Sequence, residues 1–419
     1  MPGYYIWTIG CQMNEAESER LAARLEALGY TKVAQPESAD IILLNSCVVR
    51  ASAENKAVNK LAALKSVKRA RPDVTIALTG CLVDSNTGEL EKRFPQIDYY
   101  FKPGEEPDFL PEVGKEQALP SHPPVAVYVP IMQGCNNFCT YCIVPYRRGR
   151  ERSRTVADIV SEVAELVKRG TKEVTLLGQN VDAYGKDLPG SPELADLLTE
   201  VNKIEGLYRI RFLTSHPRDM SAKLINTVAK LDKVCRVVSL PVQAGSNEIL
   251  AAMKRGYSRE EYIELVRRIR EHIPAVALST DVIVGFPGET EANFRETHDL
   301  LGEMKFDSVH IAAYSVRPGT YAAKNLTDDV PPVEKKARLD VLEKLQEAIA
   351  MEINAKLMNK TVEILALGKK NGKWWGRTKS DKLVFFSGEG DFTGKLVEIT
   401  ISHTSPWSLS GSPSVEIRE

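Results

Sequence analysis

The chain has 419 residues, of which 43% are hydrophobic and 26% are charged, and its formal net charge is −1. This composition is typical of a globular protein, and the length predicts two or three domains. The lack of a long apolar run excludes a membrane span, and the balanced charge excludes a uniformly basic RNA binder. Any RNA contact must therefore come from local patches.

The cysteine content predicts the compartment. The chain has seven cysteines, an odd number, and its first residues lack the basic and apolar regions of a signal peptide. Thiols that are not paired in disulfides are typical of a reducing environment. We therefore expect a cytoplasmic protein whose cysteines are available to bind metal.

The N-terminal part alternates strand and helix patterns. Strands are expected at Tyr4–Ile9, Ile41–Leu44 and Val74–Leu78, with helices at Glu15–Leu28 and Ala53–Arg69. Such alternation predicts an α/β fold with a doubly wound parallel sheet. A proline-rich linker ends this first domain, residues 1–122.

A cysteine follows each of these strands: Cys11, Cys47 and Cys81. The carboxyl ends of parallel strands lie along one edge of a sheet, where ligands bind. Any one of these cysteines could be a small buried apolar side chain. Their shared position in the topology favours a metal cluster instead.

A second α/β unit, residues 123–356, carries six further strand patterns separated by helix-like segments such as Val156–Arg169 and Arg259–His272. The strands are expected at Val127–Met132, Val174–Leu177, Arg209–Leu213, Val237–Leu240, Leu278–Val284 and Val309–Tyr314. This repetition predicts a partial (βα)6 barrel, whose active site would lie at the carboxyl ends of the strands.

The loop after the first of these strands contains Cys135, Cys139 and Cys142 in the spacing C-x3-C-x2-C. Three thiolates can hold three irons of a four-iron cluster and leave the fourth iron open. A structural zinc site would need a fourth Cys or His nearby, whereas the next cysteine is the distant Cys235. The spacing therefore favours a reactive cluster, and Cys235 is expected to be a packed thiol.

Other loops on the same face could bind a cofactor. We expect this role for Gly178, Gln179 and Asn180 in one loop and for Gly285 and Glu289 in another. Each loop could also be an ordinary turn, because Gly, Pro, Ser and Asn dominate turns. His216 is expected to make a structural hydrogen bond.

The C-terminal segment, residues 357–419, follows a long helix predicted at Pro332–Met358 and contains short strands typical of a small β-barrel. The strands are expected at Thr361–Ala366, Trp374–Thr378, Leu383–Phe386 and Lys395–Ser402. Basic residues between 369 and 382 alternate with aromatic ones. This pattern fits an RNA-binding surface, and it equally fits a solvated lysine-rich hairpin with aromatics in the core.

The segment from Met132 to Arg154 resembles the radical S-adenosylmethionine superfamily, and its methylthiotransferases in particular. The sequences Gly10-Cys11-Gln12-Met13-Asn14, Asn45-Ser46-Cys47 and Thr79-Gly80-Cys81 are similar to the auxiliary-cluster motifs of that family, and the final barrel resembles its TRAM domain. The insert at 136–138 and the arginine-rich tail at 148–154 are most similar to the tRNA 2-methylthio-N6-isopentenyladenosine synthases. Arg148 stands where that subfamily commonly has Thr.

The resemblance implies two [4Fe-4S] clusters and S-adenosyl-L-methionine as cofactors. Cys135, Cys139 and Cys142 would be the catalytic cysteines, whose cluster cleaves S-adenosylmethionine to a 5′-deoxyadenosyl radical. Cys11, Cys47 and Cys81 would hold a cluster that stores or donates the sulfur. The implied reaction is methylthiolation of C2 of N6-isopentenyladenosine at position 37 of a tRNA anticodon loop.

The resemblance also implies partners and alternatives. We expect a reducing donor such as flavodoxin or ferredoxin, no membrane partner, and a monomer. Arg147–Arg154 could grip tRNA phosphates, or could form a surface helix start in which Glu151 is the internal partner. Alternative substrates are N6-threonylcarbamoyladenosine in tRNA and a ribosomal-protein aspartate. A non-catalytic iron–sulfur RNA-binding protein is the alternative of another class.

Overall fold

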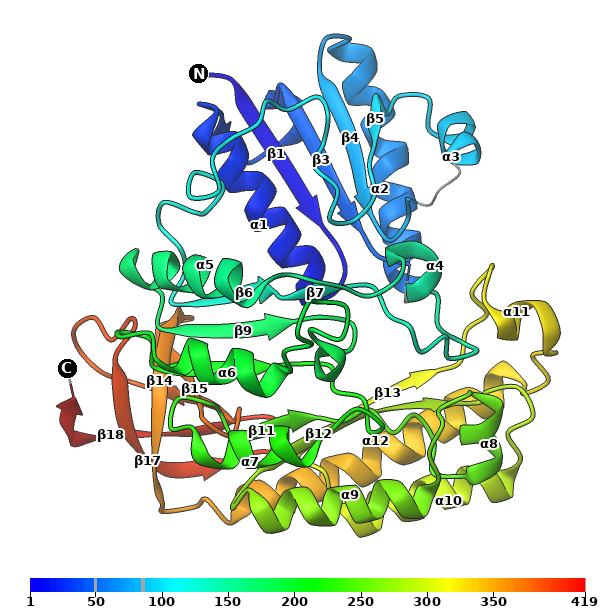
Figure 1. Cartoon of the computed structure of the whole chain (residues 1–419), viewed down its shortest axis with the longest axis vertical. Helices are drawn as coiled ribbons and strands as arrows, with labels where there is room; N and C mark the ends of the chain where they lie inside the picture. The colour runs from blue at the N-terminus through cyan, green and yellow to red at the C-terminus, as the bar shows by residue number, and fades with distance from the viewer. Residues whose placement is uncertain (49–50, 84–86, 419) are drawn as a thin grey trace.

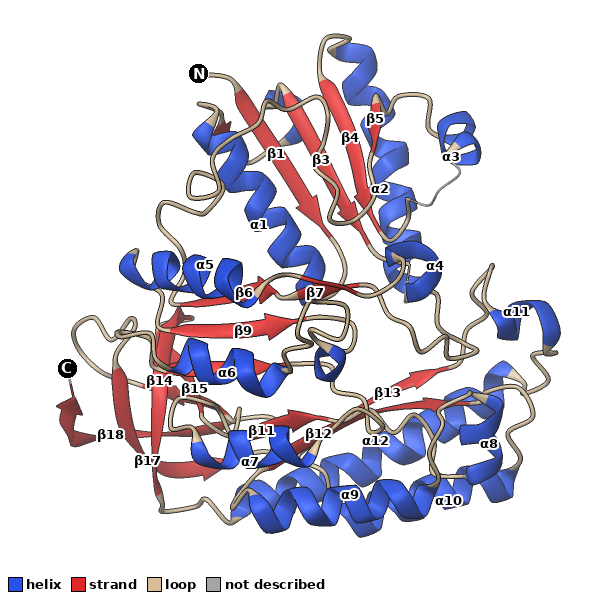
Figure 2. Ribbon diagram, viewed as in Figure 1, coloured by secondary structure: helices blue, strands red, loops and turns tan. Residues whose placement is uncertain are grey.

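The computed structural model describes residues 1–48, 51–83 and 87–418. They form an N-terminal parallel sheet, a central six-stranded half-barrel and a C-terminal closed β-barrel (Figure 1). Figure 2 shows strands on the inside of the half-barrel and helices along its outer face. Within the described ranges, no helix is both long and apolar enough to cross a membrane.

The N-terminal sheet is parallel throughout, in the order β2-β1-β3-β4-β5. Its strands are β1 (Gly3–Thr8), β2 (Thr31–Lys32), β3 (Ile41–Ser46), β4 (Thr75–Gly80) and β5 (Tyr99–Tyr100). Its helices are α1 (Gln12–Ala27), η1 (Pro36–Ser38), α2 (Ala51–Ala70) and α3 (Gly88–Arg93).

Alternation along β3 explains why both faces of this sheet are covered. Ile41 and Leu43 pack with Leu25 of α1, whereas Ile42 and Leu44 pack with Leu61 of α2. Successive side chains of a strand point to opposite faces, so a strand that is apolar throughout needs a helix on each side. The predicted doubly wound sheet is confirmed.

The half-barrel consists of two three-stranded parallel sheets, β10-β9-β6 and β11-β12-β13. A parallel bridge between Ile210 and Val234 lies at the junction of the two sheets. The strands are β6 (Ala126–Pro130), β9 (Glu173–Leu177), β10 (Arg209–Phe212), β11 (Val237–Ser239), β12 (Ala277–Val284) and β13 (Ser308–Ala313). These are the six strands that the sequence predicts.

Helices cover the outside of the half-barrel and bury its main apolar core, which includes Val174, Ile210, Leu278 and Tyr262. They are α5 (Val156–Lys168), α6 (Leu194–Asn202), α7 (Ala222–Lys230), α8 (Asn247–Ala252), α9 (Arg259–His272), α10 (Glu291–Met304) and α12 (Pro332–Ala355). The loops at the open end contain β7 (Met132–Gln133), α4 (Val144–Arg148), β8 (Arg152–Ser153), η2 (Val181–Ala183) and α11 (Tyr321–Asn325).

The C-terminal barrel closes in the order β14-β15-β16-β18-β17 around a core of its own. Its strands are β14 (Thr361–Lys370), β15 (Lys373–Thr378), β16 (Leu383–Phe386), β17 (Leu396–Thr404) and β18 (Leu409–Arg418). Figure 1 places it at the amino ends of the half-barrel strands, away from the cysteine loop. The predicted small barrel is present, with β18 as a strand that the sequence analysis missed.

Two arginines at the start of β10 hold this barrel in place. Arg209 Nη1 donates to the carbonyl of Arg377 at 2.5 Å, and Arg211 Nη2 donates to the carbonyl of Thr378 at 2.8 Å. Arg211 is also paired with Glu173 in a buried contact. Both guanidinium groups are buried and bond to the backbone of the small barrel, so they fix its contact with the half-barrel.

Candidate active site

The loop that carries Cys135, Cys139 and Cys142 runs from β7 to α4 and is fixed by backbone contacts. Cys135 N–H donates to the carbonyl of Gly149 at 3.2 Å. Gly134 has φ 82°, and a Cβ at this position would collide with the backbone of Arg150. A glycine is therefore required where this loop crosses the segment that follows α4.

The three thiols of this loop lie close enough to influence one another electrostatically. Burial raises the pKa of Cys142 to about 12, with further increases from Cys139 and Cys135. Arg255 Nη1 donates to Cys139 Sγ at 3.3 Å from a buried position. A buried guanidinium therefore lies in direct contact with one sulfur of this triad.

The cysteines of the N-terminal sheet also converge. Each follows a strand, β1, β3 or β4, and the charges of Cys47 and Cys11 both act on Cys81. Burial raises the pKa of the Cys81 thiol to about 11, and the Arg148 guanidinium opposes this increase. Arg148 Nε donates to Cys81 Sγ at 3.3 Å. The edge predicted from the topology thus gathers all three thiols.

Neither triad of described cysteines forms the compact ligand set of a single metal ion. Among the residues that the structure describes, no three His, Cys, Asp or Glu side chains could hold one metal ion. In a four-iron cluster, each cysteine binds a different iron, so the thiols lie farther apart than the ligands of a single zinc. Three thiols and a nearby arginine at each triad fit that chemistry.

The loop after β9 supports the cysteine loop. Gln179 Oε1 accepts a hydrogen bond from Gly134 N–H at 2.5 Å. Asn180 Nδ2 donates to Asp219 at 2.7 Å, while its buried Oδ1 has no partner among the described residues. A Cβ on Gly178 would collide with Met132. Of these three predicted residues, Asn180 is the one with an acceptor left for a ligand.

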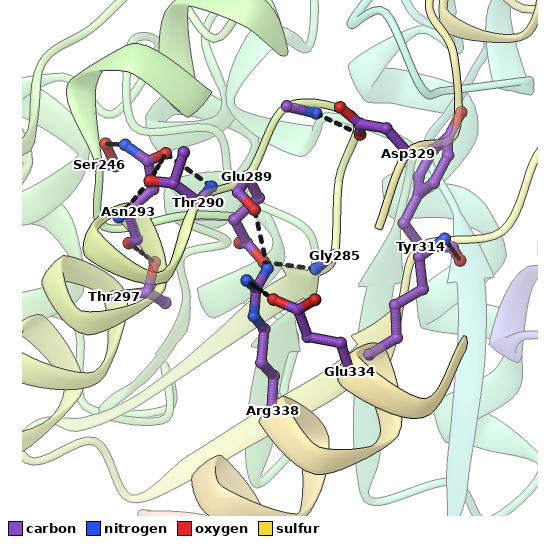
Figure 3. A network of polar contacts seen from close by, with 12 residues as sticks. Ser246, Gly285, Glu289, Thr290, Asn293, Thr297, Tyr314, Asp329, Glu334 and Arg338 are labelled. Atoms are coloured by element: carbon purple, nitrogen blue, oxygen red, sulfur yellow. Dashed lines mark hydrogen bonds and ion pairs between the residues drawn. The ribbon is translucent and has the colours of Figure 1, made fainter. Parts of the chain in front are cut away.

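Figure 3 shows the second predicted loop, at the end of β12. Glu289 Oε2 accepts from Gly285 N–H and from Arg338 Nη1, each at 2.6 Å, and Glu289 is 4% exposed. Burial raises the pKa of Glu289, although Gly285 and Arg338 oppose this increase. The carboxylate therefore ties its own loop to α12, and only Oε1 has no partner among the described residues.

A cavity of about 280 Å³ opens beside the cysteine loop and was not predicted from the sequence. Asn136, Asn137, Lys186, Arg218 and Asp219 line it. Arg218 donates to Asn137 at 2.6 Å and Lys186 pairs with Asp219 at 2.6 Å. The cavity wall is therefore polar and carries both signs of charge.

Two buried titratable groups lie next to this wall. Burial raises the pKa of Asp182 to about 7, against hydrogen bonds from Ser215 Oγ and His216 N–H. Burial, together with the charge of Arg255, lowers the pKa of His216 to about 3. His216 Nδ1 accepts from Arg218 N–H at 3.3 Å, a structural hydrogen bond of the kind expected. The sequence did not predict Asp182 as a residue near this site. Its position two residues after Asn180, in the same loop, was the signal that could have indicated it.

The arginine-rich stretch divides into two groups. Arg148 pairs with Glu17, and Arg154 pairs with Glu162, so the charges of both arginines are neutralised by partners within the chain. Arg150 and Arg152 are exposed. Glu151 accepts from Asn136, so its partner is not an arginine of the stretch as the sequence analysis considered.

Three family models match the chain. They are the Radical SAM superfamily over residues 129–301, the "Uncharacterized protein family UPF0004" over residues 3–102, and the TRAM domain over residues 359–413. With the half-barrel and its cysteine loop, these matches define the class as a radical S-adenosylmethionine enzyme.

Curated relatives narrow this class. A protein from Dehalococcoides mccartyi (strain CBDB1) is 54% identical over 98% of each chain, and one from Chloroflexus aurantiacus is 51% identical over 99% of this chain and 92% of the relative. Both are named tRNA-2-methylthio-N(6)-dimethylallyladenosine synthase. The chain belongs to this family of methylthiotransferases, as its cysteine motifs predict.

Solved structures agree with the fold. The radical S-adenosylmethionine methyltransferase TsrM from Kitasatospora setae matches with a TM-score of 0.57 and 15% identity, over 77% of this chain and 74% of that one. The cobalamin-dependent radical enzyme OxsB matches with a TM-score of 0.52 and 12% identity, over 83% and 56%. These likenesses concern the fold alone, and the predicted α/β class with a small β-barrel is confirmed.

Proposed function

We propose that this chain is the methylthiotransferase that converts N6-isopentenyladenosine (N6-dimethylallyladenosine) at position 37 of tRNA into its 2-methylthio derivative. The observation that carries the proposal is the pair of cysteine triads on a chain that is 54% identical to a synthase of this name. The proposed reaction cleaves S-adenosylmethionine and inserts sulfur, and the two triads would give each of these tasks a metal site of its own.

Cys135, Cys139 and Cys142 would hold the first cluster. When bound, it supplies the electron that cleaves S-adenosylmethionine to a carbon radical. Asn180 Oδ1 and the Glu289 carboxylate are the proposed polar contacts to the cofactor, with Gly178, Gln179 and Gly285 shaping the backbone around it. The polar cavity beside this loop is the proposed site of the adenine.

Cys11, Cys47 and Cys81 would hold the second cluster, on the edge of the N-terminal sheet. This site would store or donate the sulfur, so that each triad has a separate task. The chain's own contribution is to hold the two edges at a fixed distance, because a misplacement of about 1 Å can cost about a hundredfold in rate.

The remaining proposals concern organisation and partners. We propose domains at residues 1–122, 123–356 and 357–419, and a monomer that works in the reducing cytoplasm. A flavodoxin or ferredoxin would supply electrons. The TRAM domain and the exposed Arg150 and Arg152 would contact tRNA phosphates.

Three cysteine variants test the division of labour. Cys139→Ala should release no 5′-deoxyadenosine from S-adenosylmethionine in the presence of dithionite, whereas Cys47→Ala should release it and yet form no methylthio product. Cys235→Ala, a buried thiol outside both triads, is the matched control and should retain both reactions. Iron analysis should give about eight irons per wild-type chain and about four in Cys47→Ala.

Nucleoside mass spectrometry tests the substrate. Cells lacking the protein should lose 2-methylthio-N6-isopentenyladenosine and accumulate the unmodified precursor. If this nucleoside is unchanged and the methylthio derivative of threonylcarbamoyladenosine is lost, that nucleoside is the substrate. If a modified ribosomal-protein aspartate is lost instead, the protein side chain is the substrate. Intact clusters with no cleavage of S-adenosylmethionine would support a non-catalytic RNA-binding protein.

A further inference from the structure

The side chain of Arg148, a residue of the half-barrel unit, contacts the edge of the N-terminal sheet where Cys11, Cys47 and Cys81 lie. This residue ends α4, the short helix that begins two residues after Cys142, and Figure 1 places α4 at the carboxyl ends of β3 and β4. Arg148 is 6% exposed, and its Nε lies 3.3 Å from Cys81 Sγ. One residue thus connects the loop of one triad with a thiol of the other.

Glu17 fixes the orientation of this guanidinium. Glu17 Oε1 accepts from Nη1 at 2.6 Å and Oε2 accepts from Nη2 at 3.3 Å, which is a bidentate arrangement. The fork leaves Nε directed at the sulfur. Burying an arginine is costly unless its charge is matched, so the carboxylate and the sulfur together account for its place here.

A second cation lies on the same edge. Arg317, in the loop after β13, is 8% exposed, pairs with Glu54 of α2 at 3.3 Å, and is influenced by the charge of Cys47. Like Arg148, it comes from the half-barrel. The half-barrel therefore supplies positive charge to two of the three thiols of the N-terminal triad.

We propose that Arg148 is a positioning residue that sets the reduction potential of the iron–sulfur cluster at Cys11, Cys47 and Cys81. The inference rests on the proposed function, because it requires a cluster at this triad. One-electron reduction adds a negative charge that is shared with the ligating sulfurs. A donor and positive charge at Cys81 Sγ stabilise the reduced form, and hydrogen bonds to cluster sulfurs are known determinants of potential.

The test uses the full chain with Cys135, Cys139 and Cys142 replaced by Ala, so that only the second cluster titrates. The cluster is reduced with dithionite through redox mediators and followed by electron paramagnetic resonance. Arg148→Thr should reduce the ratio of reduced to oxidised cluster about tenfold at a fixed potential, a shift of about 59 mV to lower values. Arg152→Thr removes an exposed arginine of the same segment and should leave the potential unchanged.

Glu17→Gln provides a test of opposite sign, because it removes the charge that offsets Arg148 and should raise the potential. This variant decides the question if Arg148→Thr does not retain its cluster. Any one of three results would overturn this inference and leave the proposed function intact. They are an unchanged potential in Arg148→Thr with about four irons bound, an equal fall in Arg152→Thr, and no rise in Glu17→Gln. A parent protein that binds no iron would overturn the proposed second cluster as well.

Discussion

Buried ion pairs fix the loops around the first cysteine triad, and the pair between Arg338 and Glu289 is the most enclosed, with side chains 3% and 1% exposed. Arg338→Met would leave the Glu289 carboxylate buried without its cation. We expect a loss of about 3–5 kcal/mol in the free energy of unfolding, measured by chemical denaturation under anaerobic conditions. The pair restrains the loop that contains Gly285, so we expect the structural change in this variant to be confined to this edge of the half-barrel.

The matched control is Arg295→Met, which breaks an exposed pair with Glu291 whose side chains are 74% and 61% exposed. It should cost about 0.5 kcal/mol or less. The double variant Glu289→Gln with Arg338→Met should recover much of the loss, because no unpaired charge remains buried. Equal effects of Arg338→Met and Arg295→Met would contradict the assigned role.

The carboxyl of Asp182 makes stability depend on pH. Burial raises its pKa from 3.8 to about 7, so the folded chain keeps this proton at pH values where the unfolded chain has lost it. The stability from this group is fully present below about pH 4 and is lost as the pH rises through about 7, by up to about 4 kcal/mol. In Asp182→Asn the side chain does not titrate.

We therefore expect the thermal midpoint of Asp182→Asn, relative to wild type, to increase between pH 5 and pH 8. Differential scanning fluorimetry at several pH values would measure the difference. Asn keeps one acceptor for Ser215 Oγ and loses the acceptor for His216 N–H, which lowers stability equally at every pH and leaves the pH dependence as the readout. A difference that does not change with pH would show that Asp182 is ionised throughout this range in the folded protein.

Residues differ in how far the sequence could predict them. The gathering of six cysteines into two groups was predictable because their spacing and their places after strands are local properties, and their role as cluster ligands stays a prediction. Asp182 and Arg255 were not predictable, because their roles arise from burial against residues that lie far away in the chain. Glu289 was predicted as a ligand contact, and its ion pair with α12 depends on a helix that begins more than forty residues later.

The hairpin of β14 and β15 separates two kinds of basic residue in the TRAM domain. Lys369, Lys370 and Lys373 are exposed, with Lys369 over the Trp374 ring at 5.5 Å. Lys379 and Lys382 contact Asp232 and Asp307 of the half-barrel. Trp374 and Phe386 belong to the barrel core. The exposed lysines and core aromatics fit a solvated hairpin, and the RNA-binding surface stays a prediction, confined to the exposed lysines at the tip of the hairpin.

Replacing Lys369, Lys370 and Lys373 by Ala should weaken tRNA binding and reduce its salt dependence. Each lost phosphate contact should lower the slope of log K against log salt by about 0.9 for a duplex region. Fluorescence anisotropy at several KCl concentrations would measure this slope. The triple variant of Lys336, Lys344 and Lys356, exposed lysines on and just after α12, is the control and should leave the slope unchanged. Equal slopes for wild type and the hairpin variant would exclude the hairpin as a phosphate contact.

Helices and strands were predicted correctly where the hydrophobic pattern is long. They were missed where a short segment becomes a strand only by pairing with its neighbours. α9 was predicted at its observed bounds, Arg259–His272, because its apolar residues recur with helical spacing. β5 has two residues, and β18 contains Gly411 and Pro413 among serines, so neither has a strand pattern of its own. Both form because neighbouring strands, β4 in one sheet and β16 with β17 in the other, offer their free edges.

In the whole molecule, the cysteine loop and the TRAM domain lie at opposite ends of the half-barrel. The cysteine loop lies at the carboxyl ends of the half-barrel strands, whereas the small barrel lies at their amino ends (Figure 1). β12 alone has eight residues, so at about 3.3 Å per residue it extends for about 26 Å. The contacts of Arg209 and Arg211 with the carbonyls of Arg377 and Thr378 hold the small barrel at the amino ends of these strands. An RNA that reaches both regions must span the length of the half-barrel.

This separation predicts different behaviour for short and long RNA. An isolated anticodon stem-loop carrying N6-isopentenyladenosine should reach the site without touching the hairpin of β14 and β15, so the Lys369, Lys370 and Lys373 variant should modify it at the wild-type rate. Full-length tRNA should lose affinity in that variant, because its binding includes the distant phosphate contacts. Single-turnover assays with both RNAs over a range of enzyme concentrations would separate affinity from rate. If the variant also weakened binding of the stem-loop, the small barrel would contact RNA near the adenine itself, and the half-barrel would not be the spacer between the two sites.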